Sequence, residues 1–226
     1  MKTMTFLAQK GGVGKSTLAT QLAVSAAQAN EIACIIDIDP QGSAFLWKSL
    51  RDAKTPIVRK ALPETLHEMI ATAAAWGVTW LMVDTPPHTD KVAIEVIRVT
   101  DFILCPTKPE LFSLRALEDT SRFLDLTKSK DKALAVINDL PSGKARDVAV
   151  ETAVAALEKL EIKIADTTIG HSDPIVKAII QGKGVTETSP KSASSKEIKA
   201  LLAEINQKWP VTNSDESAVP LKLVKS

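Results

Sequence analysis

The chain has few cysteines, and their surroundings argue against a redox or metal role. Its two cysteines, Cys34 and Cys105, lie in the apolar runs "IACIID" and "DFILCP", and no ligand-spaced partner is nearby. Free cysteine is among the most buried residue types, and metal sites need several ligands at short spacing. We therefore expect two reduced, buried thiols.

The chain also lacks net charge and long hydrophobic runs. Its 28 lysines and arginines nearly balance 27 aspartates and glutamates, for a formal charge of +1. Any surface for a polyanion must therefore be a local patch. No apolar stretch approaches the roughly 18 residues of a membrane span, and "MKTMTFLAQK" does not resemble a signal peptide. We expect a soluble, intracellular protein.

The length of 226 residues fits one α/β domain, since single domains reach about 200–250 residues. Apolar runs of strand length alternate with longer helical patterns, which predicts a mostly parallel, twisted sheet with helices on both faces. We expect the domain to span 1–208. Residues 209–226 include the polar stretch "VTNSDESAVPLKLVKS" and are expected to form a mobile tail.

The predicted elements follow from periodicity and from proline at first-turn positions. Strands are predicted at 3–8, 32–37, 80–84, 102–106, 133–138 and 162–166. Helices are predicted at 15–29, 63–75, 91–99, 114–126, 144–160, 174–180 and 195–208.

The segment "MTFLAQKGGVGKSTLATQLA" reads as a strand, a glycine-rich loop and a helix. This order directs loop N–H groups and a helix N-terminus at one point, where they stabilise a polyphosphate. Lys15 is expected to contact the outer phosphates, and the Ser16 hydroxyl is expected to bind Mg²⁺. The nucleotide-binding set is Gly11, Gly12, Val13, Gly14, Lys15, Ser16 and Thr17. The general pattern has glycine where this chain has Gln9, and Lys10 is an additional lysine.

Carboxylates follow two of the predicted strands. "CIIDIDPQGS" places Asp37 and Asp39 after one strand, and "WLMVDTPPH" ends another at Asp84. Ligands of open α/β sheets gather at the carboxyl ends of the strands. A buried aspartate needs a cation or a donor, so Asp84 is expected to bind Mg²⁺ through water. The alternative for each aspartate is a helix cap or a turn.

With "KGGVGKST", "DIDPQGS" and "VDTPP" together, the chain resembles a ParA-type partition ATPase of the ParA/MinD branch of P-loop proteins, up to about Lys208. The resemblance implies an ATP- and ADP-binding, Mg²⁺-dependent ATPase that forms a homodimer around ATP. It implies that Lys10 reaches the partner subunit's phosphates. The alternative for Lys10 is a solvated loop lysine.

The resemblance also implies that Asp39 positions or activates the attacking water and that Asp37 supports the Mg²⁺ region. Lys10, Lys15 and Asp39 form the expected catalytic set of a slow ATPase, because positioning and electrostatics carry most of phosphoryl transfer. The chain departs from the common family pattern at Ser43 and His88, which puts its switch kinetics in doubt.

Two segments match the family less tightly. Asn138 stands where relatives place an adenine-binding asparagine, and the alternative is a turn residue that ends a strand. "CPTKPELFSLRALED" resembles a segment of the dimer face, although Leu111, Phe112 and Leu114 are equally consistent with local core.

Relatives of this kind bind DNA without sequence preference in the ATP state. The candidate contacts are the basic residues Lys177, Lys183, Lys191, Lys196 and Lys199. Acidic residues lie among them, so each is equally consistent with an ordinary solvated lysine. The chain starts close to its first strand, so we expect no N-terminal helix-turn-helix domain. We expect no membrane-targeting terminal helix either, because "AVPLKLVKS" is short and contains proline.

These features lead to one main hypothesis and two alternatives. The main hypothesis is a cytoplasmic, nucleoid-associated ATPase that distributes a plasmid or chromosome, with hydrolysis stimulated by a ParB-like cargo-binding partner. The first alternative keeps the fold but positions a protein cargo. The second is a metabolic P-loop enzyme, which would need a substrate pocket with a polar constellation of its own.

Overall fold

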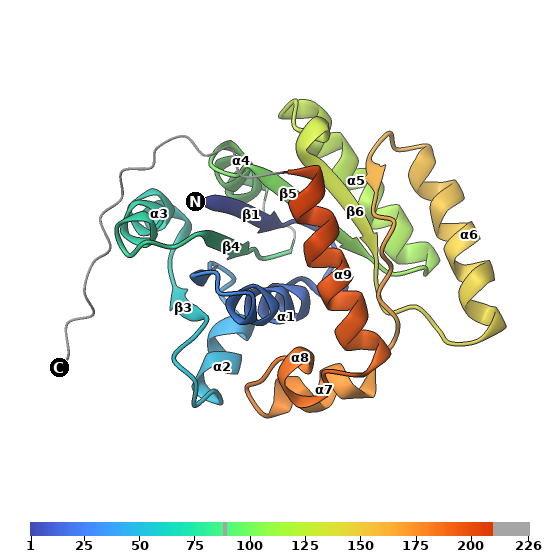
Figure 1. Cartoon of the computed structure of the whole chain (residues 1–226). Coiled ribbons are helices and arrows are strands. Elements are labelled where there is room, and N and C mark those ends of the chain that lie inside the picture. The colour runs from blue at the N-terminus through green and yellow to red at the C-terminus, as the bar shows by residue number, and fades with distance from the viewer. Residues whose placement is uncertain (88–89, 210–226) are drawn as a thin grey trace.

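Seven strands form one parallel sheet in the part of the chain that the computed structural model describes, residues 1–87 and 90–209 (Figure 1). Their spatial order is β3-β2-β4-β1-β5-β6-β7, and every neighbouring pair is parallel. The strands are β1 Lys2–Phe6, β2 Ala33–Asp37, β3 Ile57–Lys60, β4 Trp80–Asp84, β5 Phe102–Thr107, β6 Ala133–Ile137 and β7 Lys163–Ile164. The predicted α/β class with a parallel sheet is confirmed.

Helices cover both faces of this sheet (Figure 1). One layer consists of α1 Lys15–Gln28, α2 Ser43–Ser49, α7 Asp173–Ile180, α8 Val185–Thr188 and α9 Ala193–Lys208. The opposite layer consists of α3 Leu66–Ala75, α4 Asp90–Arg98, α5 Leu111–Leu126 and α6 Lys144–Glu158. Short 3₁₀ turns at Pro63–Thr65 and Lys130–Lys132 precede α3 and β6.

Strand β2 shows how the sheet separates the two layers of core. Ile35 packs with the α1 layer, whereas Cys34 and Ile36 pack with the α3 layer. Side chains alternate along a strand, and a parallel sheet buries both faces, so its strands read as continuous apolar runs. Cys34 and Cys105 are free and buried, as predicted.

Each predicted strand and helix is present, with ends displaced by up to three residues. The sequence analysis missed β3, α2 and α8. The edge strand β3 is short and half exposed, α2 follows a turn-rich segment, and α8 is four residues long, so none carries a clear periodic pattern. His88 and the predicted tail beyond Trp209 lie outside the described residues. Among the described helices, none is long and apolar enough to cross a bilayer.

Candidate nucleotide site

The carboxyl ends of β1, β2, β4 and β6 bring the predicted site segments together at one edge of the sheet. In the strand register, Asp84 lies beside Asp37 on one side and beside Phe6 on the other. The glycine loop follows β1 directly and leads into α1. Asp37 and the glycine loop are distant from Asp84 in the sequence, but all three lie at one site. This is expected for an open α/β sheet, whose ligands bind at the carboxyl ends of the strands.

The loop before α1 requires glycine at two positions. Gly12 has φ 77° and Gly14 has φ 103°, which side chains rarely adopt. A Cβ on Gly14 would also collide with Asn138 Nδ2, so the Asn138 side chain would have to move. The helix begins at Lys15, and its first-turn N–H groups have no acceptor within the helix. This arrangement is a ready anion site.

Lys15 lies inside this site and is only 7% exposed. Its Nζ donates to the carbonyl oxygens of Ala8 at 3.3 Å and of Lys10 at 3.4 Å. Burial lowers the pKa of Lys15, while the carboxylates of Asp84 and Asp39 partly raise it. Both hydrogen bonds are long, so phosphate oxygens would be better partners for this ammonium group.

Asp84 is fully buried, and neither of its carboxylate oxygens has a hydrogen-bond partner among the described residues. Burial raises its pKa to about 7, although the nearby Ser16 hydroxyl and Lys15 partly lower it. A buried carboxylate without a donor fits a cation held through water. No group of three or more His, Cys, Asp or Glu in the described ranges could hold a metal. Mg²⁺ fits nonetheless, because it commonly takes one or two carboxylates together with phosphate and water.

Asp37 and Asp39 shape the turn that leads into α2. Asp37 accepts hydrogen bonds from the N–H groups of Asp39 at 3.1 Å and Phe45 at 2.9 Å, and burial raises its pKa. Asp39 accepts one from the Gln41 N–H at 2.9 Å and is 8% exposed. Both carboxylates therefore have turn roles at the rim of the site. Their roles toward Mg²⁺ and water stay predictions.

The Lys10 side chain contacts the N-terminal end of α5. Its Nζ donates to Ser113 Oγ at 2.9 Å and lies 3.6 Å from Glu110 Oε2. Between these two partners, Leu111 and Phe112 are 72% and 75% exposed. Leu114 is buried in the core, so local core is the correct interpretation for it alone. The extra lysine thus contacts the same helical turn that carries these two exposed apolar side chains.

A cavity of about 230 Å³ continues from the glycine loop toward the end of β6 and α7. Asn138 lines it, but its Nδ2 donates to Val13 O at 2.8 Å, so adenine binding by Asn138 stays a prediction. The sequence analysis missed the neighbouring group of Lys108, Asp139 and His171. Asp139 lies 2.7 Å from Lys108 Nζ and 2.6 Å from His171 Nδ1. Its only sequence signal is a polar pair, Asn138 and Asp139, at the end of a strand.

The pKa of Asp139 is the outcome of opposing effects. Burial alone would raise it, but Lys108 and His171 hold it below its usual value. This polar group lines the same cavity as Gly12 and Gly14 of the glycine loop.

The five lysines predicted to contact DNA are all exposed, and none makes a salt bridge with a described residue. Lys177 lies on α7, Lys183 lies between α7 and α8, and Lys191 precedes α9. Lys196 and Lys199 lie on α9. They occupy the layer of helices that includes α1, and their contact with DNA stays a prediction.

Known proteins share this architecture. Residues 4–212 match the family model described as the CobQ/CobB/MinD/ParA nucleotide binding domain. The "Maintenance of carboxysome distribution protein A" of Halothiobacillus neapolitanus is 25% identical over 205 residues, which cover 87% of this chain and 92% of that protein. The chromosome partitioning protein ParA of Myxococcus xanthus is 25% identical over 160 residues, covering 53% and 56% of the two chains.

Among solved structures, the septum site-determining protein MinD of Pyrococcus horikoshii, complexed with Mg-ADP, has a TM-score of 0.72 at 14% identity. The match covers 93% of this chain and 99% of that one. The chain therefore belongs to the CobQ/CobB/MinD/ParA family of nucleotide-binding domains and is a ParA/MinD-type ATPase.

Proposed function

We propose that this ATPase dimerises around ATP, binds DNA without sequence preference as a dimer, and distributes a cargo whose bound partner stimulates hydrolysis. The observation that carries the proposal is the surface beside the phosphate loop. There Lys10 contacts the first turn of α5, which also carries the exposed Leu111 and Phe112. Adjacent large apolar side chains are typical of an association surface, and a two-fold axis would place each Lys10 against the other subunit.

The present contacts of Lys10 are weak enough to exchange for phosphate. Its side chain is 34% exposed, and that of Glu110 is 62% exposed. Exposed ion pairs contribute about 0–1 kcal/mol. A second copy bound through Leu111 and Phe112 would exclude water from this rim and strengthen the attraction between Lys10 and a γ-phosphate.

The residues of the site divide the work of hydrolysis. Lys15 and the first N–H groups of α1 hold the phosphates, and Asp39 orients the attacking water. Ser16 and Asp84, supported by Asp37, would hold Mg²⁺, which neutralises phosphate charge when bound. Lys10 from the partner subunit completes the site, so hydrolysis is slow until dimerisation and the stimulating partner order these groups.

The proposed DNA surface consists of the exposed lysines from Lys177 to Lys199. A dimer carries two copies of this set. Affinity that depends on phosphate contacts rises steeply with their number, so dimerisation would switch binding on.

The cargo is either DNA, through a ParB-like partner, or a protein body. The similarity over nearly the full length of a carboxysome distribution protein favours a protein body. The partial similarity to a chromosome partitioning ParA favours DNA. Identification of the protein that stimulates hydrolysis, by capture with the ATP-bound chain, separates the two.

The experiment that tests the proposal measures binding to random-sequence duplex DNA with ATP, ADP or no nucleotide, over a range of salt. We expect binding only with ATP, and we expect Lys10→Ala to abolish it while leaving ADP binding intact. Equal binding in all nucleotide states, or none in any, would refute the proposal. Turnover that depends on a small substrate and needs no protein partner would favour a metabolic enzyme.

A further inference from the structure

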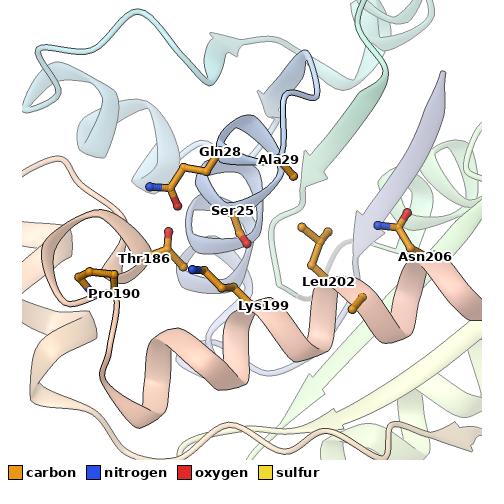
Figure 2. A pocket seen from close by; sticks show the side chains of 9 residues that line it. Ser25, Gln28, Ala29, Thr186, Pro190, Lys199, Leu202 and Asn206 are labelled. Atoms are coloured by element: carbon orange, nitrogen blue, oxygen red, sulfur yellow. The ribbon is translucent and has the colours of Figure 1, made fainter.

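A second cavity lies far from the glycine loop, between the C-terminal end of α1, α8 and α9 (Figure 2). Its volume is about 540 Å³, within the usual range for small-molecule sites. Ser25 and Lys15 are ten residues apart on α1, which separates them by about 15 Å along the helix axis. The cavity is therefore not part of the nucleotide site.

The floor of this cavity carries two hydroxyl groups without partners. Ser25 is 5% exposed and Thr186 is 3% exposed. Thr186 Oγ1 is buried and has no hydrogen-bond partner, and the Ser25 hydroxyl makes no hydrogen bond to a described residue. Figure 2 shows the Ser25 hydroxyl directed from α1 toward α9. Buried polar groups are nearly always paired, so the buried Thr186 hydroxyl indicates a missing partner, and the Ser25 hydroxyl in the same cavity is free to donate.

The rim of the cavity is polar and carries a single positive charge. Lys199 is exposed and forms no salt bridge with a described residue, and Figure 2 shows its ammonium group directed toward Thr186. The Gln28 amide lies on the opposite side, and no aspartate or glutamate lines the cavity. Asn206 accepts a hydrogen bond from Lys2 Nζ at 2.7 Å, which leaves its amide N–H groups for another acceptor.

We propose that this cavity binds a small molecule through one oxyanion group, a phosphate or a carboxylate. Lys199 supplies the charge, the Ser25 and Thr186 hydroxyls donate to the oxyanion, and Leu202 contacts the apolar part of the ligand. A DNA backbone that contacts Lys199 on the outer surface would not fill the cavity, because the hydroxyls lie at its floor and only one lysine lines it. Strong binding to DNA needs several cationic contacts.

The experiment uses the full chain saturated with Mg-ADP, so that the glycine loop is already occupied. Inorganic phosphate and acetate are titrated separately, with sodium chloride at matched ionic strength, while backbone amide chemical shifts are recorded. We expect saturable shifts at Ser25, Thr186 and Lys199 with at least one of the two anions and none with chloride. Lys199→Gln should weaken binding at least tenfold, and Ser25→Ala should also weaken it.

The matched control is Lys159→Gln, which removes an exposed lysine outside this cavity and should change the affinity less than twofold. Shifts that never saturate, or equal binding by Lys199→Gln, would overturn the proposal. A short duplex DNA is then added to the phosphate-bound protein. If DNA displaces the phosphate, and Ser25→Ala does not change this displacement, the surface belongs to DNA. That result would also overturn the proposal. No arm requires ATP or dimerisation, so failure here is separate from failure of the proposed function.

Discussion

At the scale of single residues, the buried Asp84 carboxylate is costly without a cation, and its replacement should stabilise the nucleotide-free protein. Burial raises the pKa of Asp84 from 3.8 to about 7. The native state therefore keeps a proton that the unfolded state releases, and this contribution to stability is lost as pH rises from about 4 to about 7. Each pKa unit is worth about 1.4 kcal/mol, so Asp84→Asn should raise the free energy of unfolding at pH 8 by about 2–4 kcal/mol.

Urea unfolding of the nucleotide-free protein between pH 4 and pH 8 measures this effect. The difference between Asp84→Asn and wild type should grow with pH and disappear near pH 4. Asp52→Asn, at an exposed aspartate, is the control and should follow wild type. Wild type should be stabilised more by ADP with Mg²⁺ than by ADP alone. The variant should lose this difference in the free energy of unfolding. A gain that does not depend on pH would contradict the assignment of the proton to Asp84.

If Lys10 binds phosphate across the dimer as proposed, Glu110 competes for it, and removal of Glu110 should favour the dimer. The Lys10–Glu110 pair is partly exposed at 3.6 Å, and such pairs are worth about 0.2–1 kcal/mol. Glu110→Gln should therefore increase the dimer fraction at limiting ATP about two- to fivefold, measured by analytical ultracentrifugation. Glu118→Gln removes the same charge from α5 without touching Lys10 and should have no effect. Equal changes in both variants would show a general charge effect instead.

At the scale of elements, α1 and α2 both begin at the nucleotide site and both reach the segment between α7 and α8. Gln21 Nε2 on α1 and Trp47 Nε1 on α2 donate to the Lys183 carbonyl, at 3.5 and 3.3 Å. The Gln21 side chain also accepts the Val185 N–H at 2.6 Å. Any shift of the two helices on nucleotide binding would therefore move the backbone that carries Lys183.

The pair formed by Arg51 and Glu187 fastens the end of α2 to α8. It is bidentate at 2.9 and 2.7 Å, and the Arg51 side chain is only 3% exposed. Because an unpaired buried charge is costly, Glu187→Gln should destabilise the protein by about 2–4 kcal/mol. Loss of the exposed pair by Glu95→Gln should cost less than about 0.5 kcal/mol in the same urea titration.

The Arg51–Glu187 pair also predicts a pH dependence. Burial alone would raise the pKa of Glu187, but its hydrogen bonds to Arg51 and the Gly184 N–H hold it below 4.5. The stability from this group is present above pH 4.5 and is lost as pH falls through the lowered pKa. Glu187→Gln should lack this acid-side loss. An unchanged acid profile in the variant would show that Glu187 does not carry it.

The sequence predicted the elements whose signal is local. β1, β2 and β4 are apolar runs, and the aspartates and glycines that follow them indicated the site. Whether Leu111, Phe112 and Leu114 are buried or exposed depends on how α5 packs against the sheet. Periodicity alone does not determine this packing. Lys108 and His171 lie 63 residues apart and meet only through Asp139. Such groups depend on tertiary packing, and no sequence motif predicted this one.

At the scale of the whole molecule, each subunit of an ATP-bound dimer should add its own lysines to one DNA surface. Lys183 is exposed and is fixed through its backbone to α1 and α2. Suppose that Lys183 of each subunit contacts one DNA phosphate. Lys183→Gln should then reduce the slope of log affinity against log salt by about two per dimer. Lys159→Gln should leave the slope unchanged. An unchanged slope in Lys183→Gln would remove this residue from the DNA surface.

Lys10 is proposed to act on the phosphates of the other subunit, and a mixture of two inactive variants can show whether it does. Lys10→Ala keeps its own Lys15, and Lys15→Ala keeps its own Lys10, so a mixed dimer contains one complete site only if Lys10 acts across the interface. Random pairing makes about half of the dimers mixed, with one of two sites complete. We predict that the mixture recovers on the order of a quarter of the wild-type ATPase rate with the stimulating partner present. A mixture no more active than either variant alone would contradict the account.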